Sequence, residues 1–330
     1  VDCDDSFNNL CLRTYYARVE VCKPGFLEPN CRQYGSTWKP TGLIQNNADR
    51  MRFGVFGYLL DMDRARAGGV MRAKIKDVGP MTIDPVNPPV ANPRAEFSNS
   101  NGTLNLNPDS ADATASGVSQ SGVINYLNKF GKSSLNYKSG DTLAEMYYES
   151  LRYLKNMGSA TPQYVAGLTA AMYDGFPAIT TWDDPVKYSC QRNYALMIAD
   201  VNAWCDYALP GTSITGDNNC KTGSGPVHSS TISNPIPGLN VATEVNKVAV
   251  LDNSVKWQST GYGNLATVLA PIKHPITNNP NNRGNTWYLA GLAYWANTNN
   301  LRPDLTGANS SDRVTVQTYM VDVAESGSWY

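Results

Sequence analysis

The sequence is short of histidine and of charge, and each shortage excludes a class of protein. Its two histidines, His228 and His274, stand in proline-containing stretches, so a Ser-His-Asp triad has few candidate bases. Charged residues make up 17% of the chain, below the roughly 25% of a typical soluble protein, and the formal net charge is −1. We therefore expect no nucleic-acid partner, because nothing would attract a phosphate backbone.

Motifs that present a nucleophile or hold a phosphate are missing as well. The chain has no G-x-S-x-G, the strained turn that exposes a catalytic serine. Gly131-Lys132-Ser133 matches the end of a phosphate loop, but Tyr126 occupies the position of its first glycine. We therefore predict that the chain is not an enzyme.

A glycosidase site uses two carboxylates, and the sequence has two such pairs, but the residues around each pair favour a structural role. Asp183 and Asp184 come directly before Pro185, which predicts a turn. Glu145 and Glu149 are one helical turn apart, and we interpret them as a solvated helix face plus a cap.

Long apolar runs are absent too. No stretch approaches the roughly 18 apolar residues of a membrane-spanning helix, so we expect no membrane span. The chain opens at Val1 without a signal peptide, and we interpret it as a mature or excised piece.

Seven cysteines are present, and six of them form three pairs that are close in sequence. None has the two-residue gap of a zinc knuckle, so we predict disulfides and an oxidising compartment. The predicted pairs are Cys22–Cys31, Cys205–Cys220 and, less firmly supported, Cys3–Cys11. Cys190 is left over, either as a buried free thiol or as one whose partner lies outside this sequence.

The hydrophobic pattern predicts an α/β fold. Segments 51–60, 193–199 and 314–323 are strand-like, and the first two are apolar on both faces, so we expect the three to lie parallel in one sheet. Segments 15–22 and 70–78 alternate, which predicts edge strands with one wet face.

Helices are predicted between these strands. Apolar residues at three- and four-residue spacing predict a helix over 143–157, which Thr142 and Glu145 would open as a capping box and Gly158 would end. A later helix is predicted over 286–299 and a short one over 41–50.

Two stretches rich in Pro, Gly and Asn interrupt the pattern, at about 81–140 and 206–285. We interpret them as insertions into a single domain that spans residues 1–330. Loops of this length normally carry function or disorder.

Asp141, Thr142 and Asp200 stand where predicted elements meet loops. An open α/β sheet places its ligand sites there, and such oxygens can hold Mg²⁺ or Ca²⁺. The alternative is that Thr142 only caps its helix and Asp200 only bonds a loop.

Several segments, in a shared order, resemble the PilY/PilC proteins of type IV pili. They are RMRFGVFGY (50–58), GVINYLN (122–128), LAEMYYESLRYL (143–154), SCQRNY (189–194), ADVNAW (199–204) with LPG (209–211), and AGLAYWA (290–296) with RPDL (302–305). The resemblance implies a von Willebrand factor A-like domain, a mainly parallel sheet flanked by helices. It also implies a β-propeller beyond Tyr330, which this sequence does not contain.

The resemblance implies a function at the cell surface. Family members are exported through the periplasm to the pilus tip, where they act in adhesion, pilus assembly and twitching motility. Expected partners are minor pilins or the tip complex, a host or abiotic surface receptor, and the remainder of the parent protein. The alternatives are a structural subunit of another extracellular filament and a secreted hydrolase.

The sequence departs from a metal-dependent A domain at one motif. Thr142 and Asp200 occupy the places of its second and third ligands, but the Asp-x-Ser-x-Ser after its first strand is missing. Asp4-Asp5-Ser6 has that spacing with too few residues before it for a strand. We expect bound Mg²⁺ or Ca²⁺ only if an upstream segment supplies ligands, and we expect another piece of the parent protein, rather than residues 15–21, to fill the place of the missing strand.

Overall fold

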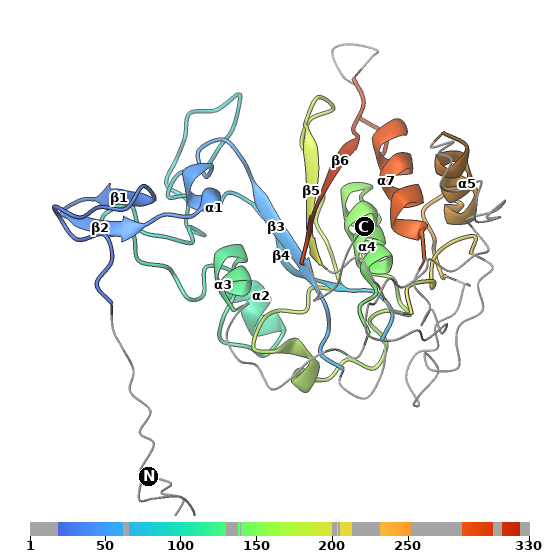
Figure 1. Cartoon of the computed structure of the whole chain (residues 1–330), viewed down its shortest axis with the longest axis horizontal. Coiled ribbons are helices and arrows are strands. Elements are labelled where there is room, and N and C mark those ends of the chain that lie inside the picture. The colour runs from blue at the N-terminus through green and yellow to red at the C-terminus, as the bar shows by residue number, and fades with distance from the viewer. Residues whose placement is uncertain are drawn as a thin grey trace, which may run out of the picture.

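The computed structural model describes residues 19–61, 66–129, 138, 140–199, 203, 205–212, 232–251, 286–305 and 312–323. This part of the chain is a mixed α/β structure with three two-stranded sheets (Figure 1). No helix in it is both long and apolar enough to cross a membrane.

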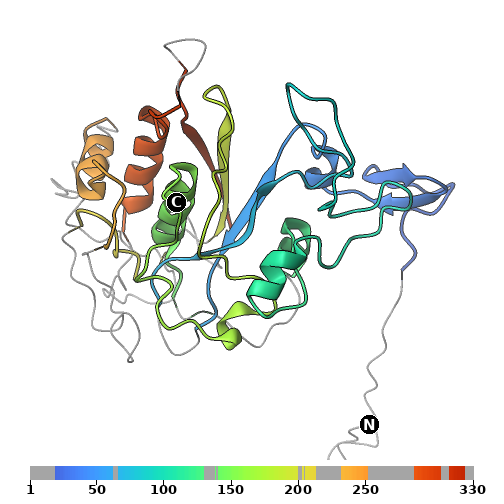
Figure 2. The ribbon, with the colours of Figure 1, turned by 180° about the vertical axis from the view of Figure 1, so that it is seen from behind.

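The main hydrophobic core is built around a parallel pair of strands. Strand β5 (Asn193–Ala199) pairs in parallel with β6 (Val316–Asp322), which confirms the predicted direction of these two segments. Helices α4 (Leu143–Leu154) and α7 (Tyr288–Thr298) lie on one side of this pair, and α5 (Val241–Leu251) packs beyond α7 (Figures 1 and 2).

The prediction of one sheet is wrong for the described strands. Strand β3 (Phe53–Gly57) pairs antiparallel with β4 (Val70–Lys76), in a sheet separate from β5 and β6. Glycines at 54 and 57 leave β3 without the side chains that a strand buried on both faces would pack. Gly57 instead lies against a ring, since a Cβ there would meet the Tyr126 hydroxyl at 1.8 Å.

Strand β4 also lacks the wet face predicted for 70–78, because Arg72 and Lys76 are buried with partners and Lys74 is half-buried. Arg72 is fully buried and donates to the backbone carbonyl of Tyr173 at 2.9 Å. The Lys76 ammonium lies 3.0 Å from a Glu96 carboxylate oxygen. The alternation along β4 therefore does not separate a buried face from a solvent-exposed one. Apolar residues lie on one face of the strand, polar residues with partners lie on the other, and both faces are covered by protein.

A small hairpin stands apart at the end of the molecule away from α5 (Figures 1 and 2). It joins β1 (Cys31–Tyr34) to β2 (Thr37–Pro40), and α1 (Leu43–Asn46) follows it, within the predicted 41–50. Residues 19–22, the described part of the predicted strand 15–22, are not a strand. Cys22 has a φ of +56° and begins a turn that its disulfide closes, which is incompatible with a strand.

The two longer predicted helices are confirmed with earlier ends. Helix α4 stops at Leu154, before Gly158, and α7 occupies all but the ends of 286–299. The stretch 81–140 also holds two short helices that the sequence pattern did not predict, α2 (Ser110–Ala115) and α3 (Val123–Asn128), and η1 (Ala170–Tyr173) follows α4.

The described parts of 206–285 belong to the main core rather than to a surface loop. Residues 206–212 and 232–251 contribute Tyr207, Leu209 and Ile236, each fully or almost fully buried against α4 and its neighbours.

Candidate functional site

The predicted ligands Thr142 and Asp141 lie at the start of α4, and Asp200 lies outside the described residues. Thr142 is fully buried, and its hydroxyl donates to the backbone carbonyl of Gly68 at 3.0 Å. Asp141 is half-buried and has a partner of its own. The geometry brings these two residues into a buried polar cluster, which we call the α4 cluster: Tyr58, Gly68, Lys138, Asp141, Thr142, Glu145 and Asp206.

The cap of α4 comes from a distant residue. The predicted capping box is wrong, because the Thr142 side chain makes no capping hydrogen bond to the helix. The carboxylate of Asp206 takes that role and accepts the backbone N–H groups of Ala144 at 2.8 Å and Glu145 at 3.0 Å. A negative charge here also complements the positive end of the helix dipole.

Glu145 connects α4 to two separate loops. Its carboxylate accepts the backbone N–H of Gly68 at 2.6 Å, of Tyr207 at 3.1 Å and of Ala208 at 2.7 Å. Glu145 is fully buried, so the expectation of a solvated face is wrong at this residue. Gly68 has a φ of +74° and lies directly against the Tyr164 ring, so only glycine fits there.

Burial controls the ionisation of the cluster. It raises the pKa of Asp206 well above the usual range of a carboxyl group, and the negative charge of Glu145 adds to that effect. Burial lowers the pKa of Lys138 to about 8. The Lys138 ammonium lies 4.7 Å from the centre of the Tyr58 ring, and burial raises the pKa of the Tyr58 hydroxyl.

Thr142 does not have the surroundings of a cation ligand. The Lys138 ammonium lies 3.3 Å from its hydroxyl, and a second cation at that oxygen would be repelled. Among the described residues, the one group of metal-ligating atoms close together is Cys22, Glu28 and Cys31, and its two sulfurs are bonded to each other. The Lys138 ammonium therefore disfavours Mg²⁺ or Ca²⁺ at the Thr142 hydroxyl, and the metal-binding role predicted for Thr142, Asp141 and Asp200 stays a prediction.

The second glutamate of α4, Glu149, forms another set of buried polar contacts. Glu149 accepts the backbone N–H of Thr161 at 3.0 Å and lies 3.4 Å from the buried Arg152 guanidinium. Burial raises the pKa of Glu149 to about 7, despite this ion pair. The expectation of a solvated face is wrong here too, since Glu149 is fully buried.

The other predicted carboxylate pair lies in irregular backbone, since residues 183–188 form neither a turn nor a bend. Asp184 accepts the backbone N–H of Val186 at 2.9 Å, and its oxygens pair with the Arg302 guanidinium at 2.6 and 2.9 Å. Asp183 accepts from the Lys74 ammonium at 2.9 Å. Both carboxylates are occupied with structural partners.

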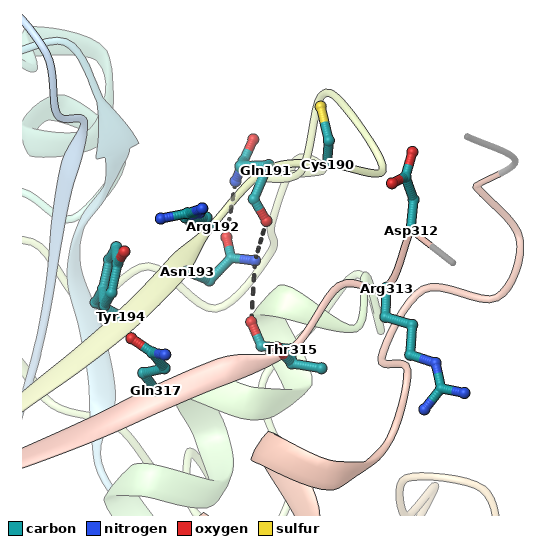
Figure 3. A pocket seen from close by; sticks show the side chains of 9 residues that line it. All are labelled: Cys190, Gln191, Arg192, Asn193, Tyr194, Asp312, Arg313, Thr315 and Gln317. Atoms are coloured by element: carbon teal, nitrogen blue, oxygen red, sulfur yellow. Dashed lines mark hydrogen bonds between the residues drawn. The ribbon is translucent and has the colours of Figure 1, made fainter. Parts of the chain in front are cut away.

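A hollow of about 550 Å³ opens where β5 and β6 begin (Figure 3). It lies at the amino ends of the parallel strands, whereas ligands of open α/β sheets bind at the carboxyl ends. Asn193 on its wall donates to the backbone carbonyls of Gln191 at 3.2 Å and Thr315 at 3.4 Å. Cys190 at its rim is a free, exposed thiol, so the interpretation of a buried thiol is wrong.

One predicted disulfide is confirmed. Cys22 and Cys31 are bonded, with an S–S distance of 2.08 Å. Cys205 is also disulfide-bonded, and its predicted partner Cys220 lies outside the described residues. Cys3 and Cys11 lie outside them too, so those two pairings stay predictions.

Sequence reasoning missed Asp206, the residue that organises the α4 cluster. Asp206 was expected only to begin an insertion, and no local pattern connects it to a helix 62 positions earlier. The predicted helix was the available signal. The first N–H groups of any buried helix need an acceptor, so a polar residue near its start was to be expected, although the sequence does not say which.

The fold and the α4 cluster define a mixed α/β domain whose buried charges hold helices and loops together. The family model described as "PilY1 homolog, second domain" matches residues 62–296, more than half of the chain. The chain belongs to this family.

Two similar proteins are both type IV pilus biogenesis factor PilY1 homologs from Xylella fastidiosa. One is 37% identical over 328 residues, which cover 94% of this chain and 25% of the relative. The other is 23% identical over 343 residues, which cover 86% of this chain and 20% of the relative. The chain thus spans a quarter or less of the length of these relatives. No solved structure matches it.

Proposed function

We propose that this chain is a non-enzymatic module of a type IV pilus tip protein, acting in adhesion and in pilus assembly and twitching motility. The observation that carries the proposal is the 37% identity to a type IV pilus biogenesis factor over 94% of this chain. A disulfide agrees with export through the periplasm to the cell surface. The proposed partners are minor pilins or the tip complex, a surface receptor and the remainder of a longer polypeptide.

We propose that α4, α7 and the β5–β6 pair form the scaffold of this module. A von Willebrand factor A-like fold contains parallel strands flanked by helices. The β5–β6 pair with α4 and α7 on one side is consistent with that part of the fold. Receptor binding is carried out by segments that project from this scaffold, because the sequences of loops on a rigid scaffold can change without destabilising the core.

Two projecting segments carry exposed apolar side chains suited to contact a receptor. Phe26, 79% exposed, stands in the loop that the Cys22–Cys31 disulfide closes, and its N–H donates to the Lys23 carbonyl at 2.8 Å. Val86, 74% exposed, stands in the loop between the bridged residues Met81 and Ala91. An apolar side chain on a constrained loop binds with a small entropic cost.

The test replaces these side chains and leaves the core intact. Removal of 206–285 is unsuitable, because its described parts lie in the core. We expect the double variant Phe26→Ser, Val86→Ser to keep the thermal stability of the parent and to lower surface adhesion. Val250→Ser is the matched control, since Val250 is 77% exposed on α5, away from the hairpin.

Assembly is scored separately from adhesion. Surface piliation and twitching are measured in the same strains, after a thermal melt has shown that each variant is folded. If the double variant is folded and adhesion, piliation and twitching all match those of the Val250→Ser control, these loops are not the working surface and the proposed mechanism is wrong.

A further inference from the structure

One face of the β5–β6 pair is apolar and exposed. We call it the outer face and define it by six residues: Tyr194, Leu196, Ile198, Tyr319, Val321 and Val323. They alternate along the two strands, with Leu196 beside Tyr319 and Ile198 beside Val321, and one polar residue of the same face, Gln317, lies beside Tyr194. Each is between 46% and 65% exposed.

The opposite face of the same strands is packed except toward the end of β6, where Met320 is 37% exposed. Met197 and Val316 are buried in the main core with α4 and α7, and the Tyr147 hydroxyl of α4 lies 2.6 Å from that of Thr318. Parallel sheets occur almost only with both faces covered. Six large apolar residues side by side on one face also exceed the scattered exposure that a folded surface normally shows.

Chain direction indicates what kind of element covers the outer face. The chain passes from β5 through α5 and α7 to β6, and such connections are right-handed in about 98% of cases, which places the helices of this connection on one side of the pair. By the same rule of handedness, a helix that covers the outer face belongs to a connection that crosses the sheet in the opposite direction. Such a connection leads to a further strand at the free edge of β5. Among the described strands β5 pairs with β6 alone, so that edge has room for a further strand.

We propose that a helix from the same polypeptide, outside these 330 residues, docks its apolar stripe on the outer face. The first relative has three quarters of its length outside the aligned region, which supplies ample chain for such a helix. Helices α4 and α7 already occupy the inner side, and no described element lies on the outer one. This inference does not depend on the proposed pilus function, because it concerns how the fold is completed.

A crosslinking experiment identifies the occupant directly. Leu196 is replaced by a photoreactive phenylalanine analogue in the longest natural polypeptide that contains this sequence, and crosslinked peptides are identified by mass spectrometry. We expect a crosslink to a helical segment outside residues 1–330. A crosslink to residues within 1–330, to a second copy of the chain or to nothing overturns the proposal, as does a natural polypeptide that contains no further residues.

Thiol accessibility provides a second, independent measurement in the same polypeptide. Ile198→Cys and Val321→Cys are made in a Cys190→Ser background, with the exposed Val250→Cys as control. We expect labelling at 198 and 321 to be about tenfold or more slower than at 250, because access requires the helix to open locally. Equal rates at all three positions overturn the proposal. Protection that disappears on dilution identifies a second copy and overturns it as well.

Discussion

Asp206 accepts the backbone N–H of Ala144 at 2.8 Å, although the two residues are 62 positions apart. The carboxylate thereby replaces the local cap that α4 lacks. We expect Asp206→Ala to destabilise the protein by about 2 kcal/mol or more, since it removes a cap and leaves two buried N–H groups without an acceptor. Urea denaturation measures the loss.

Asp206→Asn is the matched control for that prediction. Its amide oxygen keeps an acceptor for the helix N–H groups, so its stability should exceed that of the alanine variant. An alanine variant within about 0.5 kcal/mol of the parent, the usual range for a neutral surface change, would show that the cap contributes nothing.

Glu149 predicts a dependence of stability on pH. Its pKa is raised from 4.5 to about 7 in the folded protein, so the folded state binds this proton more tightly than the unfolded state does. The resulting stability is fully present below pH 4.5 and is lost as the pH rises to about 7. Across that window the loss amounts to at most about 3 kcal/mol.

Glu149→Gln removes this titration. Relative to the parent, the variant should gain stability as the pH rises through the window, whatever it loses by weakening the contact with Arg152. Denaturation at several pH values measures the difference, with the exposed Glu20→Gln as a variant of equal charge change. Parallel pH profiles for the parent and Glu149→Gln would contradict the prediction.

Arg72 predicts a large loss of stability from one side chain. Its guanidinium donates to the carbonyls of Tyr173 at 2.9 Å and Pro177 at 3.2 Å from a fully buried position. Arg72→Met should cost about 3 kcal/mol or more, because each buried carbonyl left without a donor costs roughly 1–3 kcal/mol. The exposed Arg32→Met should change the free energy of unfolding by no more than about 0.5 kcal/mol. Similar losses in the two variants would refute the role of Arg72.

The Cys22–Cys31 disulfide predicts a local effect. The joint substitution Cys22→Ser, Cys31→Ser should raise amide exchange across residues 19–42, because a short closed loop contributes roughly 2–3 kcal/mol where it is anchored. Exchange in α4 should not change. Cys190→Ser, which alters a free thiol, should leave both regions as they were. Equal exchange across 19–42 in both variants would show that the disulfide does not hold the hairpin.

Local pattern sufficed for the longer helices and for the strand character of β5 and β6. The apolar spacing of α4 and the strand-like character of β5 and β6 predicted a helix and a parallel pair, because each needs only one buried stripe or run.

Pattern failed where a polar residue finds its partner far away. Thr142 and Glu145 have capping-box spacing, yet Glu145 bonds the N–H of Gly68, 77 positions earlier. Arg72 alternates with apolar neighbours as an exposed residue would, but its carbonyl partners at Tyr173 and Pro177 are over 100 positions away. The α4 cluster could not be predicted, because its hydrogen bonds other than that between Lys138 and Thr142 join residues far apart in sequence.

The same long-range contacts set an order on folding. The first turn of α4 takes the acceptor for its N–H groups from Asp206, and its Glu145 carboxylate takes donors from Gly68 and Ala208, so these contacts form only after the chain as far as position 208 is present. Contacts of such sequence separation close slowly, since the loop entropy is lost before they form. In a polypeptide delivered from its amino end, the start of α4 is therefore completed only after the segment that holds Asp206 and Ala208 has followed the helix.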